Sequence, residues 1–226
     1  MMRFLQPKLN KFYSQIIKPG SLVYDIGSND GDYAETFLTL GAHVICVEPQ
    51  PEYIKKLQKK FGINKKVTLV QQGIGEKAGT LDFHISSFNS PNSTFSTEFR
   101  EHSRYKYRTW DKVIKVEVIT LNQLIQQFGL PHFCKVDVEG YEWEVLSTLK
   151  KPIPFISFEF MTELNEKSFK IIKHLDTLGK ARYNLCLGMS YRYHLPEWVD
   201  SKTMVSLLEE KQEKAWNGDI YVKFIE

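Results

Sequence analysis

The sequence predicts an α/β fold in which a mostly parallel sheet carries helices on both faces. Short apolar runs alternate along the chain with longer amphipathic stretches, which is typical of such folds. A glycine-containing turn, 27–31, directly follows the apolar run 22–26. The next apolar run, 43–47, ends at the acidic residue Glu48. The first two strands therefore deliver polar groups to the same edge of the sheet, where parallel sheets bind their ligands.

The remaining segments continue this alternation in order. Amphipathic periodicity predicts a lead-in helix over 1–19, and Pro51 suits the first turn of another helix. Strands are predicted at 22–26, 43–47, 67–71, 81–85, 115–119, 133–138, 155–160, 181–187 and 219–225. Helices are predicted at 32–40, 51–61, 121–128, 141–149 and 163–178.

Composition indicates one globular domain, 1–226, because 42% of the residues are hydrophobic and 25% are charged. No run reaches the roughly eighteen apolar residues of a membrane span, and the amino terminus lacks a signal-peptide core, so we expect a cytoplasmic protein. The three cysteines, Cys46, Cys134 and Cys186, are far apart in apolar runs, which predicts reduced core thiols. A net charge of +3 is too small to indicate a nucleic-acid partner.

The turn after the first strand and Glu48 together predict a pocket for an adenosine-containing cofactor. Glycines let a cofactor approach the backbone, and an acid in this place accepts hydrogen bonds from ribose hydroxyls. The turn lacks G-x-G-x-x-G spacing, and Asp25, Asp30 and Asp32 add negative charge that would repel a pyrophosphate. Such acids favour a cationic cofactor such as S-adenosylmethionine. A competing interpretation is that Asp30 or Asp32 caps the following helix.

Two irregular segments have the composition of substrate-binding loops. The segment 86–112 is rich in Ser and Asn and then basic and aromatic, which makes it a candidate lid over the acceptor. The segment 188–200 carries Tyr191, Tyr193 and Trp198, whose rings suit a sugar or planar substrate in a second active-site loop. For both segments the alternative is a surface loop anchored by its aromatic residues.

The segment 135–142 makes the most specific match to a known family. Joined to four other segments in the same order, it resembles the FkbM family of S-adenosylmethionine-dependent methyltransferases; these segments are the 25–31 turn, Glu48-Pro49, Asn92-Ser93-Thr94 and 156–160. The resemblance covers roughly 22–160. It implies a Rossmann-like class I methyltransferase fold with seven strands, the last of them antiparallel. It also implies methyl transfer to a hydroxyl group of a small-molecule or glycan acceptor, such as a sugar or natural product.

This resemblance implies a set of cofactor-binding residues at the carboxyl ends of the strands. The turn after the first strand would surround the methionine portion, Glu48 would bind the ribose, and Gln72-Gly73-Ile74 would lie beside the adenine. The family often has an asparagine with small residues beside the adenine, whereas this sequence departs from that pattern with Gln72-Gly73-Ile74-Gly75. Asp137 would project into the same cleft, near the methyl group or the amino end of the cofactor. The full set is Asp25, Gly27, Ser28, Asn29, Asp30, Gly31, Glu48, Pro49, Gly73, Ile74 and Asp137.

Methyl transfer to an unactivated alcohol requires alignment of the reactants and removal of the hydroxyl proton. Asp137 and Glu139 are the predicted catalytic pair, with Glu159 as the third candidate. His102 or His194 could reach in from the loops, since imidazole exchanges protons readily near neutral pH. Three converging carboxylates could also hold Mg²⁺, so base catalysis and metal assistance both stay open. The structural alternative for Asp137 is a cap on the following helix.

Two other functions stay open on the sequence. A NAD-dependent oxidoreductase shares the layout of strand, turn, helix and acid, although the missing central glycine opposes it. A non-catalytic RNA-binding module could use the basic and aromatic segment 100–112. In a related hypothesis, Arg104 and Arg108 make this segment a lid for an anionic acceptor, such as a nucleotide-linked or phosphorylated sugar. The sequence makes no prediction of the oligomeric state.

Overall fold

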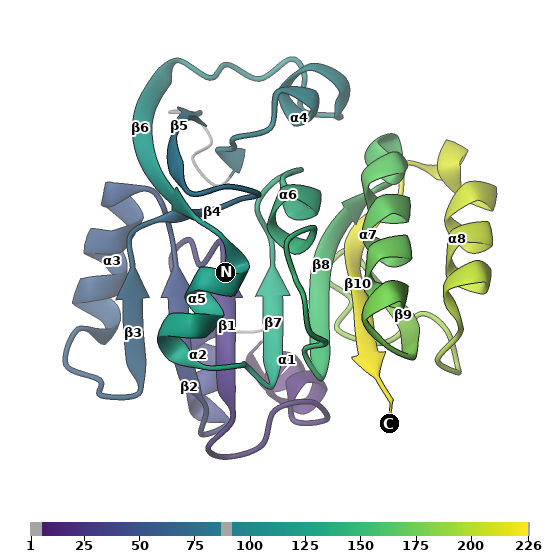
Figure 1. Cartoon of the computed structure of the whole chain (residues 1–226), viewed down its shortest axis with the longest axis horizontal. Helices are drawn as coiled ribbons and strands as arrows, with labels where there is room; N and C mark the ends of the chain where they lie inside the picture. Colours follow the sequence, from purple (N-terminus) through teal and green to yellow (C-terminus); the bar gives the residue numbers. More distant parts are fainter. Residues whose placement is uncertain (1–5, 87–91, 226) are drawn as a thin grey trace.

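The computed structural model describes residues 6–86 and 92–225, and its centre is a seven-stranded sheet. The strands are β1 (Leu22–Ile26), β2 (His43–Val47), β3 (Val67–Val70), β7 (Phe133–Val136), β8 (Phe155–Met161), β9 (Ala181–Leu187) and β10 (Asn217–Phe224). Their order is β3-β2-β1-β7-β8-β10-β9 (Figure 1). β10 is antiparallel to both of its neighbours, whereas the other adjacent pairs are parallel. The predicted fold class is therefore confirmed.

Helices cover both faces of this sheet. Successive residues of a strand point to opposite sides, so each strand packs against both layers of helices. Val23 and Val44 pack with the helices of one face, and Tyr24 and Ile45 pack with those of the other. The first group is α1 (Gln6–Tyr13), α2 (Asp32–Thr39) and α3 (Pro51–Phe61). The second group is α5 (Leu121–Phe128), α6 (Glu142–Leu146), α7 (Asn165–Leu178) and α8 (Ser201–Glu210), with short 3₁₀ turns at Thr162–Leu164 and Gln212–Lys214.

Local sequence explains several helix boundaries. α3 begins with Pro51, at a position where the missing N–H would have no partner in any case. α5 begins with a capping box, in which Thr120 and Gln123 each accept a hydrogen bond from the backbone N–H of the other. The chain then leaves α5 at Gly129, whose φ of 94° favours glycine.

A second sheet, of three strands, lies beyond the carboxyl ends of the main sheet, at the top of Figure 1. It consists of β4 (Gly73–Ile74), β6 (Lys112–Ile119) and β5 (Gly79–Ile85), in that order. The strands predicted at 81–85 and 115–119 exist, but they belong to this separate sheet. The expectation of an irregular segment over 86–112 is wrong for α4 (Thr97–His102), where Ser96 accepts the capping hydrogen bond. Residues 87–91 of that segment lie outside the described residues.

Other predicted helices have different limits. Of the lead-in helix expected over 1–19, residues 1–5 lie outside the described part of the chain, and α1 ends at Tyr13. The helix expected over 141–149 is limited to α6. α8 is absent from the sequence predictions, because only Met204 and Leu208 form its buried stripe. None of the described helices is long and apolar enough to cross a membrane.

Candidate active site

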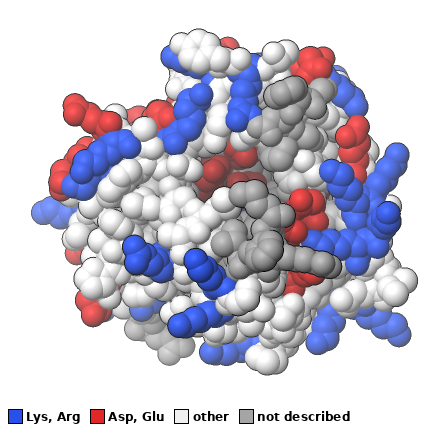
Figure 2. Space-filling model, turned by 180° about the vertical axis from the view of Figure 1, so that it is seen from behind, with Lys and Arg blue, Asp and Glu red and all other residues white. Residues whose placement is uncertain are grey.

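A cavity of about 310 Å³ opens between the carboxyl ends of the main sheet and the second sheet. Its walls come from the turn after β1, the end of β2, β4, β5 and the turn after β7. This is the edge at which parallel sheets bind ligands, and the volume is in the range of small-molecule sites. Figure 2 shows acidic side chains deep in a hollow on the face opposite to the one seen in Figure 1.

Gly27 allows the turn after β1 to lie directly against the turn after β7. Its φ is 86°, and a Cβ at this position would lie 1.8 Å from the backbone oxygen of Asp137. Only glycine fits such a close approach. The N–H groups of Gly27 and Ser28 donate to the Val47 carbonyl at 2.9 and 3.1 Å, so the turn is also fixed to the end of β2. One glycine thus joins three walls of the cavity.

Glu48, the acid predicted to bind ribose, lines the cavity at the end of β2. Its two carboxylate oxygens accept hydrogen bonds from the N–H groups of Asn29 and Gln50, each at 2.9 Å. Glu48 is only 4% exposed, and burial raises the pKa of its carboxyl to about 7 although these two hydrogen bonds lower it. Each oxygen has a further lone pair, so the hydroxyl groups of a ligand can still donate to it.

The predicted cofactor-binding residues fall into two groups. Asp25 and Gly31 are not among the described residues that line the cavity. Asp25 is buried, and a Cβ on Gly31 would lie 2.6 Å from the side chains of Leu57 and Phe61. Asp25 and Gly31 therefore support the turn from the side that faces away from the cavity. The cavity is lined by the other members of the set, which are Gly27, Ser28, Asn29, Asp30, Glu48, Pro49, Gly73, Ile74 and Asp137.

The helix-capping interpretations are wrong for all three aspartates concerned. α2 has Gly31 at its N-cap, with no side-chain hydrogen bond there, so neither Asp30 nor Asp32 caps it. Asp32 instead lines the cavity and pairs with Lys60 at 3.1 Å. The N-cap of α6 is Tyr141, likewise with no side-chain hydrogen bond, and Asp137 instead pairs with Lys135.

Asp137, Glu139 and Glu159 converge at one end of the cavity. One carboxylate oxygen of each lies within 4.8 Å of those of the other two. Asp137 and Glu139 line the cavity, whereas Glu159 approaches from β8 and lines a small adjoining pocket. The structure therefore brings together the three residues that the sequence analysis proposed as catalytic.

In two of these carboxylates, one oxygen atom has no hydrogen-bond partner among the described residues. Within the described part of the chain, Oε2 of Glu139 and Oε2 of Glu159 are buried and accept no hydrogen bond. Burial, followed by the nearby charge of Asp137, raises the pKa of the Glu139 carboxyl. Burial, followed by the charge of Glu139, raises the pKa of the Glu159 carboxyl. Such acids readily accept a proton or a cation.

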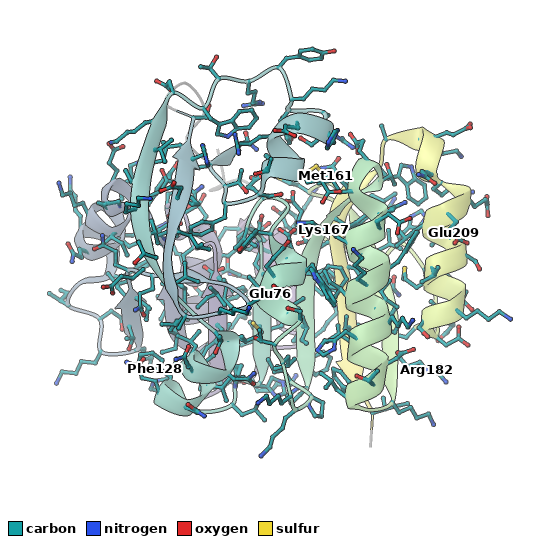
Figure 3. The ribbon with its side chains drawn as sticks, turned by 45° about the horizontal axis from the view of Figure 1, so that its top comes forward. Glu76, Phe128, Met161, Lys167, Arg182 and Glu209 are labelled. Atoms are coloured by element: carbon teal, nitrogen blue, oxygen red, sulfur yellow. The ribbon has the colours of Figure 1, made fainter. Side chains whose placement is uncertain are left out.

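The backbone at Glu139 is strained, with a φ of 55°, and neighbouring side chains hold it in place. Thr94 Oγ1 donates to the Glu139 carbonyl at 2.7 Å, and Asn92 Nδ2 donates to Glu139 Oε1 at 3.2 Å. Lys167, labelled in Figure 3, reaches from α7 and donates to the carbonyl of Gly140 at 2.8 Å. Strain that is supported in this way is common at functional sites.

Two charged residues at this site were not predicted from the sequence. Lys135 lies within β7, and its Nζ is 2.6 Å from Oδ2 of Asp137. Asp219 lies on β10 opposite Glu159, and burial raises the pKa of its carboxyl to about 6 although Lys135 lowers it. A lysine inside an otherwise apolar strand was a signal for the first of these, since such a charge needs a buried partner.

The two candidate substrate loops differ in their relation to the cavity. Ser93 and Phe95, of the 86–112 segment, line it. No residue of the 188–200 segment is among the described lining residues. The ring of Tyr193 packs instead on Phe12 of α1, with ring centroids 4.9 Å apart. The candidate bases His102 and His194 are also absent from that lining.

The basic groups of the candidate lid make contacts within the protein. Arg104 donates two hydrogen bonds of 2.8 Å to the carboxylate of Glu163, and a third to the carbonyl of Ala215. The guanidinium of Arg108 lies 4.6 Å from the ring centroid of Tyr105. Arg104 thereby fixes the segment after α4 to the start of β10.

Comparisons with known proteins agree with this geometry. Residues 25–185 match the family model described as the methyltransferase FkbM domain. The 2-O-methyltransferase NoeI of Sinorhizobium fredii (strain NBRC 101917 / NGR234) is 28% identical over 186 residues, which cover 74% of this chain and 76% of that protein. The crystal structure of precorrin-6y C5,15-methyltransferase from Geobacter metallireducens GS-15 is similar in fold, with a TM-score of 0.52 and 9% identity over 99% of this chain and 89% of that one.

The seven-stranded sheet with its reversed strand has the class I methyltransferase fold, and the cavity lies at its carboxyl edge. Because the family model matches residues 25–185, the chain belongs to the FkbM methyltransferase family. The family resemblance predicted from the sequence is confirmed. Methyl transfer is thereby supported over the NAD-dependent oxidoreductase and the RNA-binding module.

Proposed function

We propose that this protein is an S-adenosylmethionine-dependent O-methyltransferase that acts on a hydroxyl group of a sugar or natural product. The observation that carries the proposal is a cavity with Glu48 on one wall and Asp137 and Glu139 on another. Such a cavity suits a cationic donor and an acceptor that must lose a proton. The relative named as a 2-O-methyltransferase supports oxygen as the accepting atom.

The cofactor would lie along the carboxyl ends of β1, β2 and β4. Glu48 would accept hydrogen bonds from the ribose hydroxyls, Gly73 and Ile74 would lie beside the adenine, and the turn after β1 would hold the methionine portion. When bound, S-adenosylmethionine supplies a methyl group already activated by the sulfonium. The residues of this chain therefore need only orient the reactants and take up the acceptor proton.

We assign the role of general base to Glu139. It lines the cavity, and its Oε2 has no hydrogen-bond partner in the described part of the chain. Burial raises the pKa of its carboxyl, which makes its carboxylate a stronger base than that of an exposed glutamate. The acceptor hydroxyl would pass its proton to Glu139, with Glu159 beside it to share the proton. Asp137 would face the positive charge of the donor.

The same three carboxylates, Asp137, Glu139 and Glu159, would suit Mg²⁺, which prefers oxygen ligands. Bound there, Mg²⁺ would make the acceptor hydroxyl more acidic. Titration of Mg²⁺ into protein treated with EDTA, for the wild type and for Glu139→Gln, separates the two forms of catalysis. Full activity without Mg²⁺, and no heat of Mg²⁺ binding, would leave base catalysis alone.

The charge of the cavity favours a neutral acceptor over an anionic one. Asp30, Glu48, Asp137 and Glu139 all line it, so a phosphate close to the reacting hydroxyl would be repelled. Arg104, the main candidate for binding an anion, is engaged by Glu163. We therefore propose an uncharged glycan or natural product and no nucleic-acid partner.

Calorimetric titration of S-adenosylmethionine and of NAD⁺ tests the cofactor, and Glu48→Ala tests the site. We expect the wild type to bind S-adenosylmethionine but not NAD⁺. We expect Glu48→Ala to bind S-adenosylmethionine at least about tenfold more weakly, since a hydrogen bond to a carboxylate contributes roughly 1.5–3 kcal/mol. Transfer of labelled methyl groups to methyl glycosides, with 2-deoxy glycosides as matched controls, tests the acceptor. Folded wild-type protein that does not bind S-adenosylmethionine would refute the proposal.

A further inference from the structure

Lys135 is a cation buried beneath the cavity. It pairs in register with Asp25 of β1 and Ser157 of β8, and it is 1% exposed. Its Nζ lies 2.6 Å from Oδ2 of Asp137 and 4.3 Å from the ring centroid of Tyr33. Asp137 and Tyr33 both line the cavity, but Lys135 is not among the described residues that do so. Lys135 therefore contacts two residues that line the cavity without lining it itself.

The surroundings of Lys135 hold more negative charge than one ion pair requires. Burial lowers the pKa of its ammonium, but Asp137, Asp219 and Asp25 together raise it above its usual value, so the lysine is charged. For a buried ammonium paired with a single carboxylate, the attraction between the charges at best offsets the cost of removing them from water. Here three carboxylates from β1, the end of β7 and β10 surround it, and of these Asp137 is the one that lines the cavity.

We propose that Lys135 is a positioning residue for the methyl donor: it holds one oxygen of Asp137, so that the rest of this carboxylate faces the sulfonium of S-adenosylmethionine. This assignment rests on the proposed function. The side chain of Asp137 is 32% exposed, so the carboxylate is accessible from the cavity while Lys135 holds Oδ2. The contact with Gly27 fixes the backbone of the same residue. Lys135 thus acts through Asp137 and does not touch the donor itself.

The effect of removing Lys135 has a sign that separates positioning from charge. Lys135→Met takes away a positive charge close to a cationic ligand, so charge alone would make S-adenosylmethionine bind more tightly. Positioning predicts weaker binding, because the released carboxylate of Asp137 no longer faces the donor. S-adenosylhomocysteine lacks the sulfonium charge and serves as the matched ligand.

Calorimetry with both ligands on the wild type, Lys135→Met, Asp137→Asn and the double variant tests the assignment, with thermal unfolding as a check on folding. We expect each single change to weaken S-adenosylmethionine binding about tenfold, the value of one charge-assisted contact, and to alter S-adenosylhomocysteine binding less than about threefold. The double variant should bind no more weakly than Asp137→Asn, since the two residues act in series. Unchanged or tighter binding by folded Lys135→Met, or losses that multiply in the double variant, would overturn the proposal.

A second variant covers the case in which Lys135→Met does not fold. Lys135→Arg keeps the charge, but its planar guanidinium cannot hold Asp137 in the same place, so we expect binding at least about threefold weaker. Unchanged binding by this variant also overturns the assignment. Wild-type protein that does not bind S-adenosylmethionine refutes the proposed function. Binding by the wild type, with unaffected variants, refutes only the role of Lys135.

Discussion

The substitution Gly27→Ala tests how the fold places Asp137 in the cavity. A Cβ at position 27 would lie 1.8 Å from the backbone oxygen of Asp137, a distance that real Cβ atoms do not show. The turns after β1 and β7 would have to separate by more than 1 Å to reach the 3.0 Å limit for such contacts. Because Asp137 lines the cavity next to this contact, its carboxylate would move with the turn.

The expected cost has two parts. Alanine at a φ of 86° loses about 1–2 kcal/mol of folding free energy from backbone strain alone. Overpacking against Asp137 adds roughly 1–3 kcal/mol, so the free energy of unfolding should fall by about 2–5 kcal/mol in total. A displacement of about 1 Å at a reacting group costs on the order of a hundredfold in rate, so methyl transfer should fall by that factor.

Gly20 supplies a matched control for this experiment. Its φ is 84°, but a Cβ there would meet no atom within 4 Å. Gly20→Ala should therefore lose only the strain of about 1–2 kcal/mol and keep its affinity for S-adenosylmethionine. Urea unfolding and calorimetry would measure both quantities. Equal stability losses in the two variants, with normal cofactor binding by Gly27→Ala, would refute the argument that this contact positions Asp137.

Three further outcomes are expected. Arg104→Ala should lower the free energy of unfolding by no more than about 1 kcal/mol and leave methyl transfer unchanged, because its ion pair is structural; a drop in turnover at unchanged stability would restore the lid hypothesis. The raised pKa of Asp219, about 6 against an ordinary 3.8, means that its stabilising contribution is complete below pH 3.8 and is lost as the pH rises through 6. Asp219→Asn should therefore flatten the fall in stability between these pH values in urea titrations, and parallel profiles for the variant and the wild type would contradict this. Thr94→Val should reduce methyl transfer about tenfold, because it releases the Glu139 carbonyl. The control Thr148→Val loses a hydrogen bond away from the cavity and should keep its activity. Equal activities of the two variants would argue against a role for the strained backbone at Glu139.

Much of the fold could be predicted because its signals are local. The apolar run of β1 and the turn after it are legible over a few residues, as is the capping box of α5. α8 could not be predicted in the same way, since two buried residues make too weak a stripe. The separate sheet of β4, β5 and β6 could not be predicted either, because strand propensity does not say which strand will be the partner.

The candidate site shows the same division. Glu48 could be singled out from its place at the end of an apolar run, as could Asp137 and Glu139. Lys135 was overlooked, although a charge within a buried strand calls for a partner. The 188–200 segment has the aromatic composition of a binding loop, but its Tyr193 packs on α1, because aromatic rings serve a core as well as a ligand.

The sequence by itself determined the alternation of strands and helices, the glycine turn and the acids that follow the strands, because these depend on periodicity and on neighbours along the chain. Only the tertiary structure decided that Glu139 and Glu159 lie together with Asp137, and that Lys135 lies beneath them. That proximity depends on the register of β7 with β8 and of β8 with β10, which brings residues distant in sequence to one edge of the sheet.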